Sequence, residues 1–312
     1  MTSSPNSSRE DIPHNLSLKG LVVEFGRGKR AGRGSGRGRE TLRALDGTSL
    51  EVRPGERVAV IGASGAGKST LFRALTRSVP LTAGVVRLGG ENLYALGGRE
   101  LRRARRGVGV VHQAYNLVPQ LPAGMNVALG EVGRAGNLGA LRTLLFGPGA
   151  AAAERGRAAL ERVGLGEQAA TRTADLSGGQ QQRVAVARLL VQRPALILAD
   201  EPFAAVDPVT TERILRTLLE LNEEGATLLV NLHDVELARR FFRIIGLRRG
   251  RVVFDGHPRE LTEDRLQSLY AGEAREAEPD EDPGRYRRPG REAQETELPT
   301  PVVRGQDGNS AH

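Results

Sequence analysis

The sequence contains no cysteine, which excludes disulfide frameworks, thiolate zinc sites and cysteine nucleophiles. Its five histidines leave little for an imidazole-based metal centre. No uninterrupted apolar run reaches the roughly 18 residues that a membrane-spanning helix needs. The start, MTSSPNSSRE, lacks the basic region and apolar core of a signal peptide. We therefore expect a cytoplasmic chain that meets a membrane only through a partner.

The surplus of positive charge is concentrated in one stretch. The formal net charge is +8, and between Gly26 and Arg39 basic residues stand among glycines with no acid between them. They are Arg27, Lys29, Arg30, Arg33, Arg37 and Arg39. We interpret 27–39 as a solvated insertion in a hairpin that joins Leu21–Phe25 to Leu50–Val52. Contact with anionic lipid is an alternative. Nucleic-acid binding is disfavoured, because no aromatic residue interleaves the arginines to stack on bases.

Length and composition fit one domain with polar ends. The chain has 312 residues, of which 39% are hydrophobic, enough for one sizeable core. Residues 1–15 are polar and punctuated by proline, whereas 273–312 are rich in Glu, Arg, Pro and Gly. We therefore predict disorder at both ends and a single domain over 16–272.

Between these ends, short apolar runs alternate with helical patterns. The runs are Arg57–Ile61, Val108–His112, Ala195–Ala199, Thr227–Asn231 and Arg243–Leu247. Their apolarity is continuous rather than alternating, which indicates strands covered on both faces, as in a parallel α/β sheet. The stretch from about 117 to 173 has no convincing strand pattern, but several Ala- and Leu-rich helical stretches such as Ala150–Val163. It therefore predicts a helical insertion.

The strongest motif is GASGAGKST, which follows the run ending at Ile61 and precedes a helical pattern over Leu71–Arg77. It predicts a phosphate-binding loop, in which backbone N–H groups turn inward onto phosphate oxygens and the next helix directs its positive end at the same anion. Lys68 is expected to reach the β- and γ-phosphates, and Ser69 to hold Mg²⁺. The loop comprises Gly62, Ala63, Ser64, Gly65, Ala66, Gly67, Lys68, Ser69 and Thr70.

Two further motifs lie downstream. In ALILADE a buried strand ends in Asp200 and Glu201, at the sheet edge where open α/β sheets bind ligands. Asp200 suits a Mg²⁺ role and Glu201 polarisation of the attacking water; the alternative is a solvated acidic turn. In LSGGQ, Ser177 is a good N-cap for a helix that runs to about Gln192, and the glycines allow close approach to an anion. By itself this string is more often only a capped helix start.

In order and spacing the three motifs resemble the ATP-binding cassette (ABC) ATPases, over roughly Leu18 to Gly256. The resemblance implies a P-loop fold of ABC type: a RecA-like parallel-sheet core, an antiparallel β subdomain and an inserted helical subdomain. It identifies Gln113 with the Q-loop glutamine, a Mg²⁺ ligand and catalytic residue, and His233 with the catalytic switch histidine. Asp207 matches the D-loop aspartate, although the serine that often precedes it is absent here. Phe25 is a candidate for stacking on adenine, with core packing as the alternative.

By the same resemblance, ATP and Mg²⁺ are the cofactors and two copies pair head to tail. The signature residues Ser177, Gly178, Gly179 and Gln180 of one subunit then cover ATP on the phosphate loop of the other. Closing and opening of this homodimer drives integral membrane permease subunits, which work with a periplasmic or lipid-anchored solute-binding protein. The chain is then expected at the cytoplasmic face of the cell membrane.

Several stretches most resemble the ATP-binding subunit of phosphonate importers. They are His112–Gly130, Leu160–Leu165, Leu228–Gly256 and Pro258–Glu273. The resemblance implies ATP hydrolysis coupled to import of phosphonate or a related phosphorus oxyanion. Other small-solute importers and lipoprotein-release or exporter ATPases remain alternatives. Two further rivals are a non-transport ABC ATPase, disfavoured because no long heptad run separates the motifs, and a simple phosphotransferase with an incidental LSGGQ.

Overall fold

The computed structural model describes residues 15–26, 41–112, 116–132, 142–143, 147–204 and 206–271. All of them belong to the first of the two units into which the chain divides, Met1–Glu273 and Ala274–His312. The insertion predicted at 27–39, residues 1–14 and the predicted tail 273–312 lie outside the described residues.

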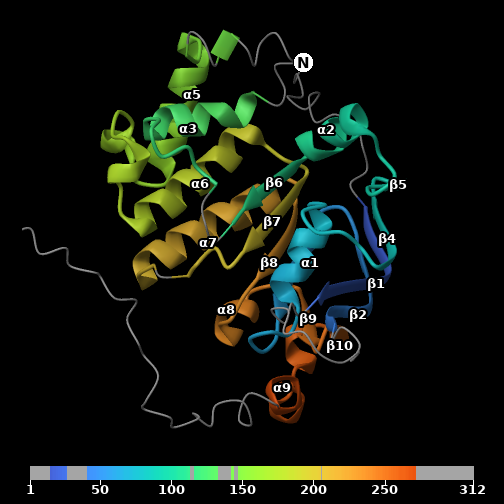
Figure 1. Ribbon diagram of the computed structural model, residues 1–312. Helices are drawn as coiled ribbons and strands as arrows, with labels where there is room; N and C mark the ends of the chain where they lie inside the picture. The colour runs from blue at the N-terminus through green and yellow to red at the C-terminus, as the bar shows by residue number, and fades with distance from the viewer. Residues whose placement is uncertain are drawn as a thin grey trace, which may run out of the picture. The chain divides into compact units, whose positions relative to one another are not determined.

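Six strands form the central sheet, in the order β10-β9-β3-β8-β7-β6 (Figure 1). Their bounds are β3 (Arg57–Ile61), β6 (Val108–Val111), β7 (Leu196–Asp200), β8 (Thr227–Asn231), β9 (Arg243–Arg248) and β10 (Arg251–Gly256). Neighbours pair in parallel from β9 to β6, whereas β10 pairs antiparallel with β9. The five predicted apolar runs are the five parallel strands, with ends shifted by one residue at β6, β7 and β9.

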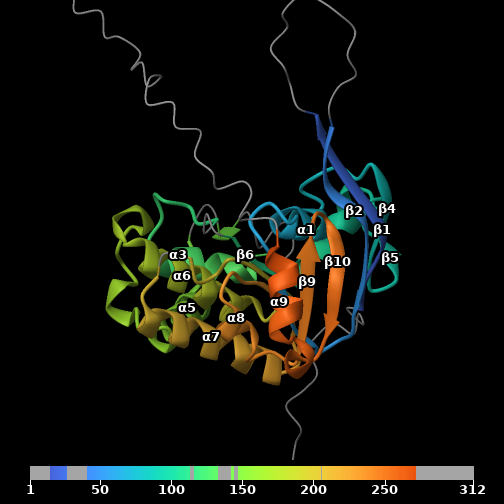
Figure 2. The same cartoon turned by 90° about the horizontal axis from the view of Figure 1, so that it is seen from below.

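A second, antiparallel sheet has the order β2-β1-β4-β5. Its strands are β1 (Leu16–Gly26), β2 (Thr41–Val52), β4 (Ala83–Leu88) and β5 (Glu91–Asn92). β1 and β2 form the predicted hairpin, which is longer than the sequence patterns indicated because both strands extend to the edge of the 27–40 segment. Figure 2 shows this sheet beside α1 and β10.

Helices cover both faces of the central sheet. They are α1 (Lys68–Leu75), α2 (Gly98–Arg106), α3 (Ala123–Ala128), α5 (Ala150–Arg162), α6 (Gly178–Gln192), α7 (Pro208–Glu223), α8 (Val235–Ala238) and α9 (Glu263–Tyr270). Short 3-10 turns occupy η1 (Leu129–Glu131), η2 (Gly166–Gln168), η3 (Thr173–Asp175) and η4 (Pro258–Glu260).

Two apolar cores sandwich the sheet. Ala59 and Ile61 of β3 pack with α5, α6 and α7, whereas Val58 and Val60 pack with α1 and the antiparallel sheet. Successive residues of a strand point to opposite faces, so burial of both faces makes the strand sequences continuously apolar.

The region predicted to be a helical insertion contains α3 and α5, which pack together and on α6, with one isolated bridge between Pro122 and Arg172. The predicted fold class is confirmed in its three parts: a mostly parallel sheet, an antiparallel β subdomain and inserted helices. Within the described ranges, none of the helices has the length and apolarity to cross a membrane.

Candidate nucleotide site

The predicted phosphate loop joins β3 to α1 and depends on glycine at two points. Gly62 has φ 147° and Gly67 has φ 103°. A Cβ atom would lie 2.2 Å from the Leu247 carbonyl oxygen at position 62, and 2.3 Å from the Ala44 carbonyl oxygen at position 67. Both distances are far below a van der Waals contact, so these two glycines are dictated by close backbone approach as well as by conformation.

The loop is anchored at its base and exposed at its tip. The Ala66 N–H donates to the Ala63 carbonyl at 3.1 Å, and the Ala66 carbonyl accepts from the Gly250 N–H at 2.9 Å, in the turn between β9 and β10. Ser64 and Gly65 are exposed. This arrangement leaves a short backbone arch open to solvent at the start of α1.

Lys68 opens α1 with its side chain folded into the loop. Only 5% of the residue is exposed, and Nζ donates to the carbonyl oxygens of Gly62 at 2.6 Å and Ala63 at 3.1 Å. Ser69 and Thr70 follow it, half-buried. A positive charge, the N-terminus of α1 and an exposed backbone loop thus lie together, which is the composition of an anion site.

The predicted acidic pair stands beside this loop. Because β7 and β8 are adjacent and parallel, Asp200 and Asn231 lie side by side at their carboxyl ends. The Asn231 Nδ2 donates to Asp200 Oδ1 at 2.6 Å, and the Ser69 hydroxyl lies 3.4 Å from the same oxygen. Asn231 was not predicted, although it ends a predicted strand two residues before His233.

Glu201 and His233 form the second contact between these strand ends. The Glu201 Oε1 lies 2.6 Å from His233 Nε2. Glu201 has φ 52°, a left-handed conformation that costs a non-glycine residue about 1 kcal/mol or more. Its backbone therefore turns sharply out of β7, and the turn presents the carboxylate at the sheet edge beside the histidine.

Donor chemistry at this edge fits a hard cation. The Ser69 hydroxyl and the Asp200 carboxylate offer oxygen ligands, the type Mg²⁺ prefers. No group of three or more His, Cys, Asp or Glu that could hold a metal occurs among the residues with described positions. Mg²⁺ commonly takes one or two protein oxygens and completes its shell with phosphates and water, so a two-residue set suffices.

The LSGGQ segment caps α6 as predicted. The Ser177 hydroxyl accepts from the Gln180 N–H at 3.3 Å, and Gln180 Oε1 accepts in return from the Ser177 N–H at 2.8 Å. Ser177 and Gly178 are exposed. Within the described part of the chain, no hydrogen bond or ion pair joins the four signature residues to the phosphate loop. The N–H groups of Ser177 and Gln180 are used in this cap, and the exposed Ser177 and Gly178 place the start of α6 at the surface.

One further contact ties this helix to the acidic turn, and no sequence motif indicates it. Gln182 is 2% exposed, and its Nε2 donates to the Pro202 carbonyl at 2.7 Å. Its Oε1 is buried without a hydrogen-bond partner in the described structure. Pro202 directly follows Glu201, so α6 holds the turn that presents the candidate base.

The remaining predicted residues lie around this centre. Asp207 is the N-cap of α7 and accepts from the Thr210 N–H at 2.9 Å. Hydrogen bonds from Thr210 hold the Asp207 pKa below its ordinary value. Phe25 is 38% exposed near the end of β1, where it pairs with Leu42, two residues from the Ala44 that contacts Gly67. Gln113 lies outside the described residues.

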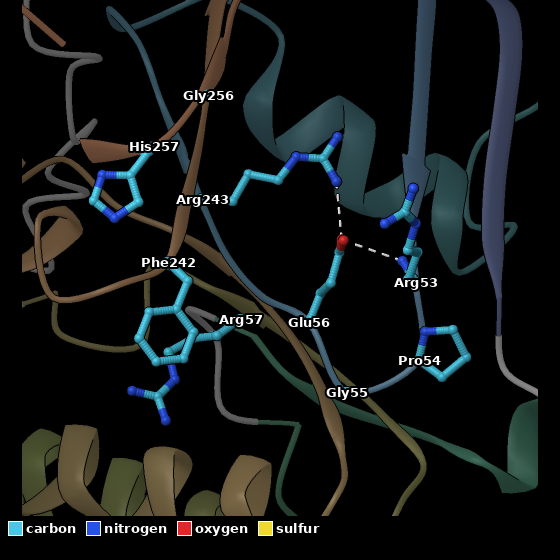
Figure 3. A pocket seen from close by; sticks show the side chains of 9 residues that line it. All are labelled: Arg53, Pro54, Gly55, Glu56, Arg57, Phe242, Arg243, Gly256 and His257. Atoms are coloured by element: carbon cyan, nitrogen blue, oxygen red, sulfur yellow. Dashed lines mark hydrogen bonds and ion pairs between the residues drawn. The ribbon is translucent and has the colours of Figure 1, made fainter. Parts of the chain in front are cut away.

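A different cleft opens at the amino ends of β3 and β9 (Figure 3). Two of its basic residues already have partners: Arg243 bonds Asp255 at 2.6 Å and Glu56 at 2.8 Å, and Arg57 lies over the Phe242 ring at 4.7 Å. The phosphate loop and both acids follow the carboxyl ends of β3 and β7, at the opposite edge of the sheet. This cleft therefore plays no part in the nucleotide site.

Comparison with known proteins identifies a family with the same sequence features. Residues 45–204 match the family model described as "ABC transporter". A protein of Halalkalibacterium halodurans named "Phosphonates import ATP-binding protein PhnC 2" is 46% identical over 227 residues, covering 71% of this chain and 91% of the relative. A protein of the same name from Rhodopseudomonas palustris is 46% identical over 267 residues, covering 84% and 91%.

Solved structures of cassettes are similar too. The dimeric post-hydrolysis state of the cassette MJ0796 bound to ADP and Pi is 33% identical, with a TM-score of 0.65, over 78% of this chain and 98% of that one. A second dimeric structure of MJ0796, described as a bacterial ABC transporter cassette, is 34% identical with the same TM-score and coverage.

Proposed function

This chain belongs to the ABC transporter family as an ATP-binding subunit that hydrolyses ATP to energise transport, and on that premise we propose that it serves uptake of phosphonate or a related phosphorus oxyanion. Support for the solute comes from two relatives at 46% identity that carry the phosphonate-import name. One of the stretches that suggested this subfamily, His112–Gly130, lies within the residues 45–204 that match the ABC transporter model.

The proposed site residues act mainly by position and charge. The glycine arch and the α1 N-terminus hold the triphosphate, and Lys68 neutralises its outer phosphates. Ser69 and Asp200 hold Mg²⁺, with Gln113 as a further ligand; bound there, the ion supplies charge neutralisation of the phosphates. Glu201 orients and polarises the attacking water, and His233 steadies the Glu201 carboxylate through their 2.6 Å contact.

A homodimer completes each site in this proposal. Ser177 and Gly178 are exposed, and among the described residues no hydrogen bond joins the signature to its own phosphate loop, so the start of α6 is accessible to a nucleotide held by a second copy. The two MJ0796 structures described as dimers support this arrangement. Integral membrane permease subunits and a solute-binding protein are the further partners, and the dimer then works at the cytoplasmic face of the membrane.

The single observation that carries the catalytic proposal is Glu201 turned out of β7 onto His233. We expect the Glu201→Gln variant to bind ATP with Mg²⁺ and to form a stable dimer, because the amide keeps the shape but polarises water far less. Size-exclusion chromatography with light scattering measures this. A variant that hydrolyses ATP at the normal rate, or remains monomeric at saturating ATP, contradicts the proposed role.

The solute is tested in cells that depend on this transporter. Growth on a phosphonate as the only phosphorus source is expected to require Lys68 and Glu201, whereas growth on inorganic phosphate is not. Loss of both growth phenotypes, or of neither, argues for a different solute.

A further inference from the structure

Seven arginines gather where three helices end. α2 carries Arg99, Arg102, Arg103, Arg105 and Arg106, all exposed. Arg73 in the last turn of α1 and Arg193 just after α6 are exposed as well. We call these seven residues the arginine surface. It is separate in sequence from the basic 27–39 segment.

Hydrogen bonds bring the three helix ends together. Arg105 Nη2 donates to the Thr76 carbonyl, at the C-cap of α1, at 2.7 Å. Gln192 Nε2, in the last turn of α6, donates at 2.9 Å to the carbonyl of Val108, two residues after α2. Figure 1 shows α2 beside the start of β6. The ends of the three helices that carry these arginines therefore lie next to one another.

This patch carries almost no compensating negative charge. The α2 sequence GRELRRARR holds five arginines and one glutamate, and the Oε2 of that Glu100 already accepts from the Gly97 N–H at 3.1 Å. None of the seven arginines forms an ion pair with an acid in the part of the chain that the structure describes. Helix C-termini attract a cation or two each, but that preference accounts for fewer charges than are present.

We propose that the arginine surface binds the anionic headgroups of a lipid bilayer. Clusters of about four to eight basic residues on a helix are the pattern for such binding. Stacking on nucleic-acid bases is disfavoured, since α2 has no aromatic residue and neighbouring Tyr94 turns its hydroxyl inward to the Ala74 and Val79 carbonyls. The proposal goes beyond the transported solute: it assigns this subunit a membrane contact of its own.

Such a contact leaves the nucleotide site accessible. α2 precedes β6, so its five arginines lie on the helix that leads into the amino end of that strand. The phosphate loop, Glu201 and His233 follow the carboxyl ends of strands parallel to β6. A bilayer at one edge of the sheet and ATP at the other do not compete.

Co-sedimentation of the purified full chain with vesicles tests the proposal. We expect binding to vesicles that contain phosphatidylglycerol, no binding to pure phosphatidylcholine, and weakening as salt is raised. Replacing Arg99, Arg102, Arg103 and Arg106 by Gln is expected to lower the partition coefficient about tenfold or more. Arg105 is kept because it bonds α1.

A charge-matched control separates this surface from net charge. Arg53, Arg172, Arg216 and Arg259 are exposed arginines on other elements, and replacing all four by Gln removes the same four charges. This control is expected to bind vesicles nearly as well as the parent. An equal loss in both variants overturns the proposal, and so does unchanged binding in the α2 variant. Repeating all three proteins without residues 27–39 removes the contribution of that segment.

Two further measurements separate loss of membrane binding from misfolding and from loss of ATPase activity. Replacing the four α2 arginines by Lys restores the charge and is expected to restore binding, which a folding defect does not permit. ATP turnover of the α2 variant is expected to match the parent, so failure of the membrane contact is distinguishable from failure of the proposed transport function. If the α2 variant keeps vesicle binding but no longer assembles with permease subunits in detergent, the surface is a protein contact and the proposal is wrong.

Discussion

Position 62 of the phosphate loop has no room for a side chain. A methyl group there meets the Leu247 carbonyl oxygen at 2.2 Å, and φ is 147°. We expect Gly62→Ala to abolish ATP binding, since either the phosphate loop or the backbone at Leu247 must move to make room for the methyl group. Gly65→Ala is the matched control: φ is 75° but nothing lies within 4 Å, so it should cost only about 1 kcal/mol of unfolding free energy. Denaturant titration and nucleotide fluorescence measure both; equal stability losses contradict the argument.

Gln182 is the clearest case of a positioning residue. Its 2.7 Å bond to the Pro202 carbonyl ties α6 to the turn that carries Glu201. Gln182→Met keeps the side-chain volume but removes the donor, so we expect kcat to fall while KM for ATP changes little, together with a loss of about 1–3 kcal/mol in unfolding free energy.

Gln192→Met supplies the comparison for Gln182. It removes a similar bond, to the Val108 carbonyl at 2.9 Å, from the far end of the same helix. We expect a loss of stability without a change in kcat. If the two variants affect kcat equally, Gln182 is merely structural.

The site residues that could be predicted from the sequence lie in local motifs, whereas Gln182, which was missed, acts through a tertiary contact. Lys68, Asp200, Glu201 and His233 sit in motifs or directly after buried strands, where chain direction fixes their place. Gln182 acts by a tertiary hydrogen bond spanning 20 residues, and such a partner has no local signature. Asp207 is an intermediate case: its D-loop role rests on resemblance, but a carboxylate before Pro208 is also a recognisable helix cap.

Among the elements, α7 depends on its cap in a pH-dependent way. The pKa of Asp207 is lowered by hydrogen bonds from Thr210. A lowered folded-state pKa means that the ionised cap stabilises the protein above the ordinary value of 3.8, and that this contribution is lost as pH falls through the lower value. The melting temperature of Asp207→Ala is therefore expected to lie below that of the parent by a constant amount between about pH 5 and 8, with the gap closing in acid.

Asp207→Asn checks this explanation, because the amide oxygen caps the helix without titrating. Its gap to the parent should be small near neutral pH. If the melting-temperature difference between Asp207→Ala and the parent does not change in acid, the ionisation of Asp207 does not contribute to the stability of the cap.

Element prediction succeeded where both faces of a strand are buried. The five parallel strands read as continuous apolar runs, whereas β4, β5 and β10 alternate or are too short to carry a pattern. α2 has no buried residue, so it lacks the apolar stripe by which a helix is recognised. Its arginines were visible in the sequence, but only the fold brings α2 next to the ends of α1 and α6.

For the whole molecule, the decisive question is whether one chain or two make an active site. Ser177 and Gly178 are exposed, and no hydrogen bond joins them to their own phosphate loop among the described residues, so Lys68 and Ser177 should serve different ATP molecules. We expect Lys68→Ala and Ser177→Arg to be inactive alone, and a mixture of the two to regain activity. Each mixed dimer holds one site with both residues intact, because that site takes its loop from one variant and its signature from the other.

Random pairing makes half of the dimers mixed, with one of two sites intact, so about a quarter of the parental rate is the ceiling for this mixture. Turnover is measured after the two variants are unfolded, mixed and refolded together, with each variant refolded alone as the baseline. A double variant that carries both changes in one chain, mixed with the parent, is the opposite control. If the sites are shared, its mixed dimers have no intact site, whereas one site stays intact if each chain acts alone. If the two inactive variants never complement one another, each chain hydrolyses ATP by itself, and the exposed N-terminus of α6 needs another explanation.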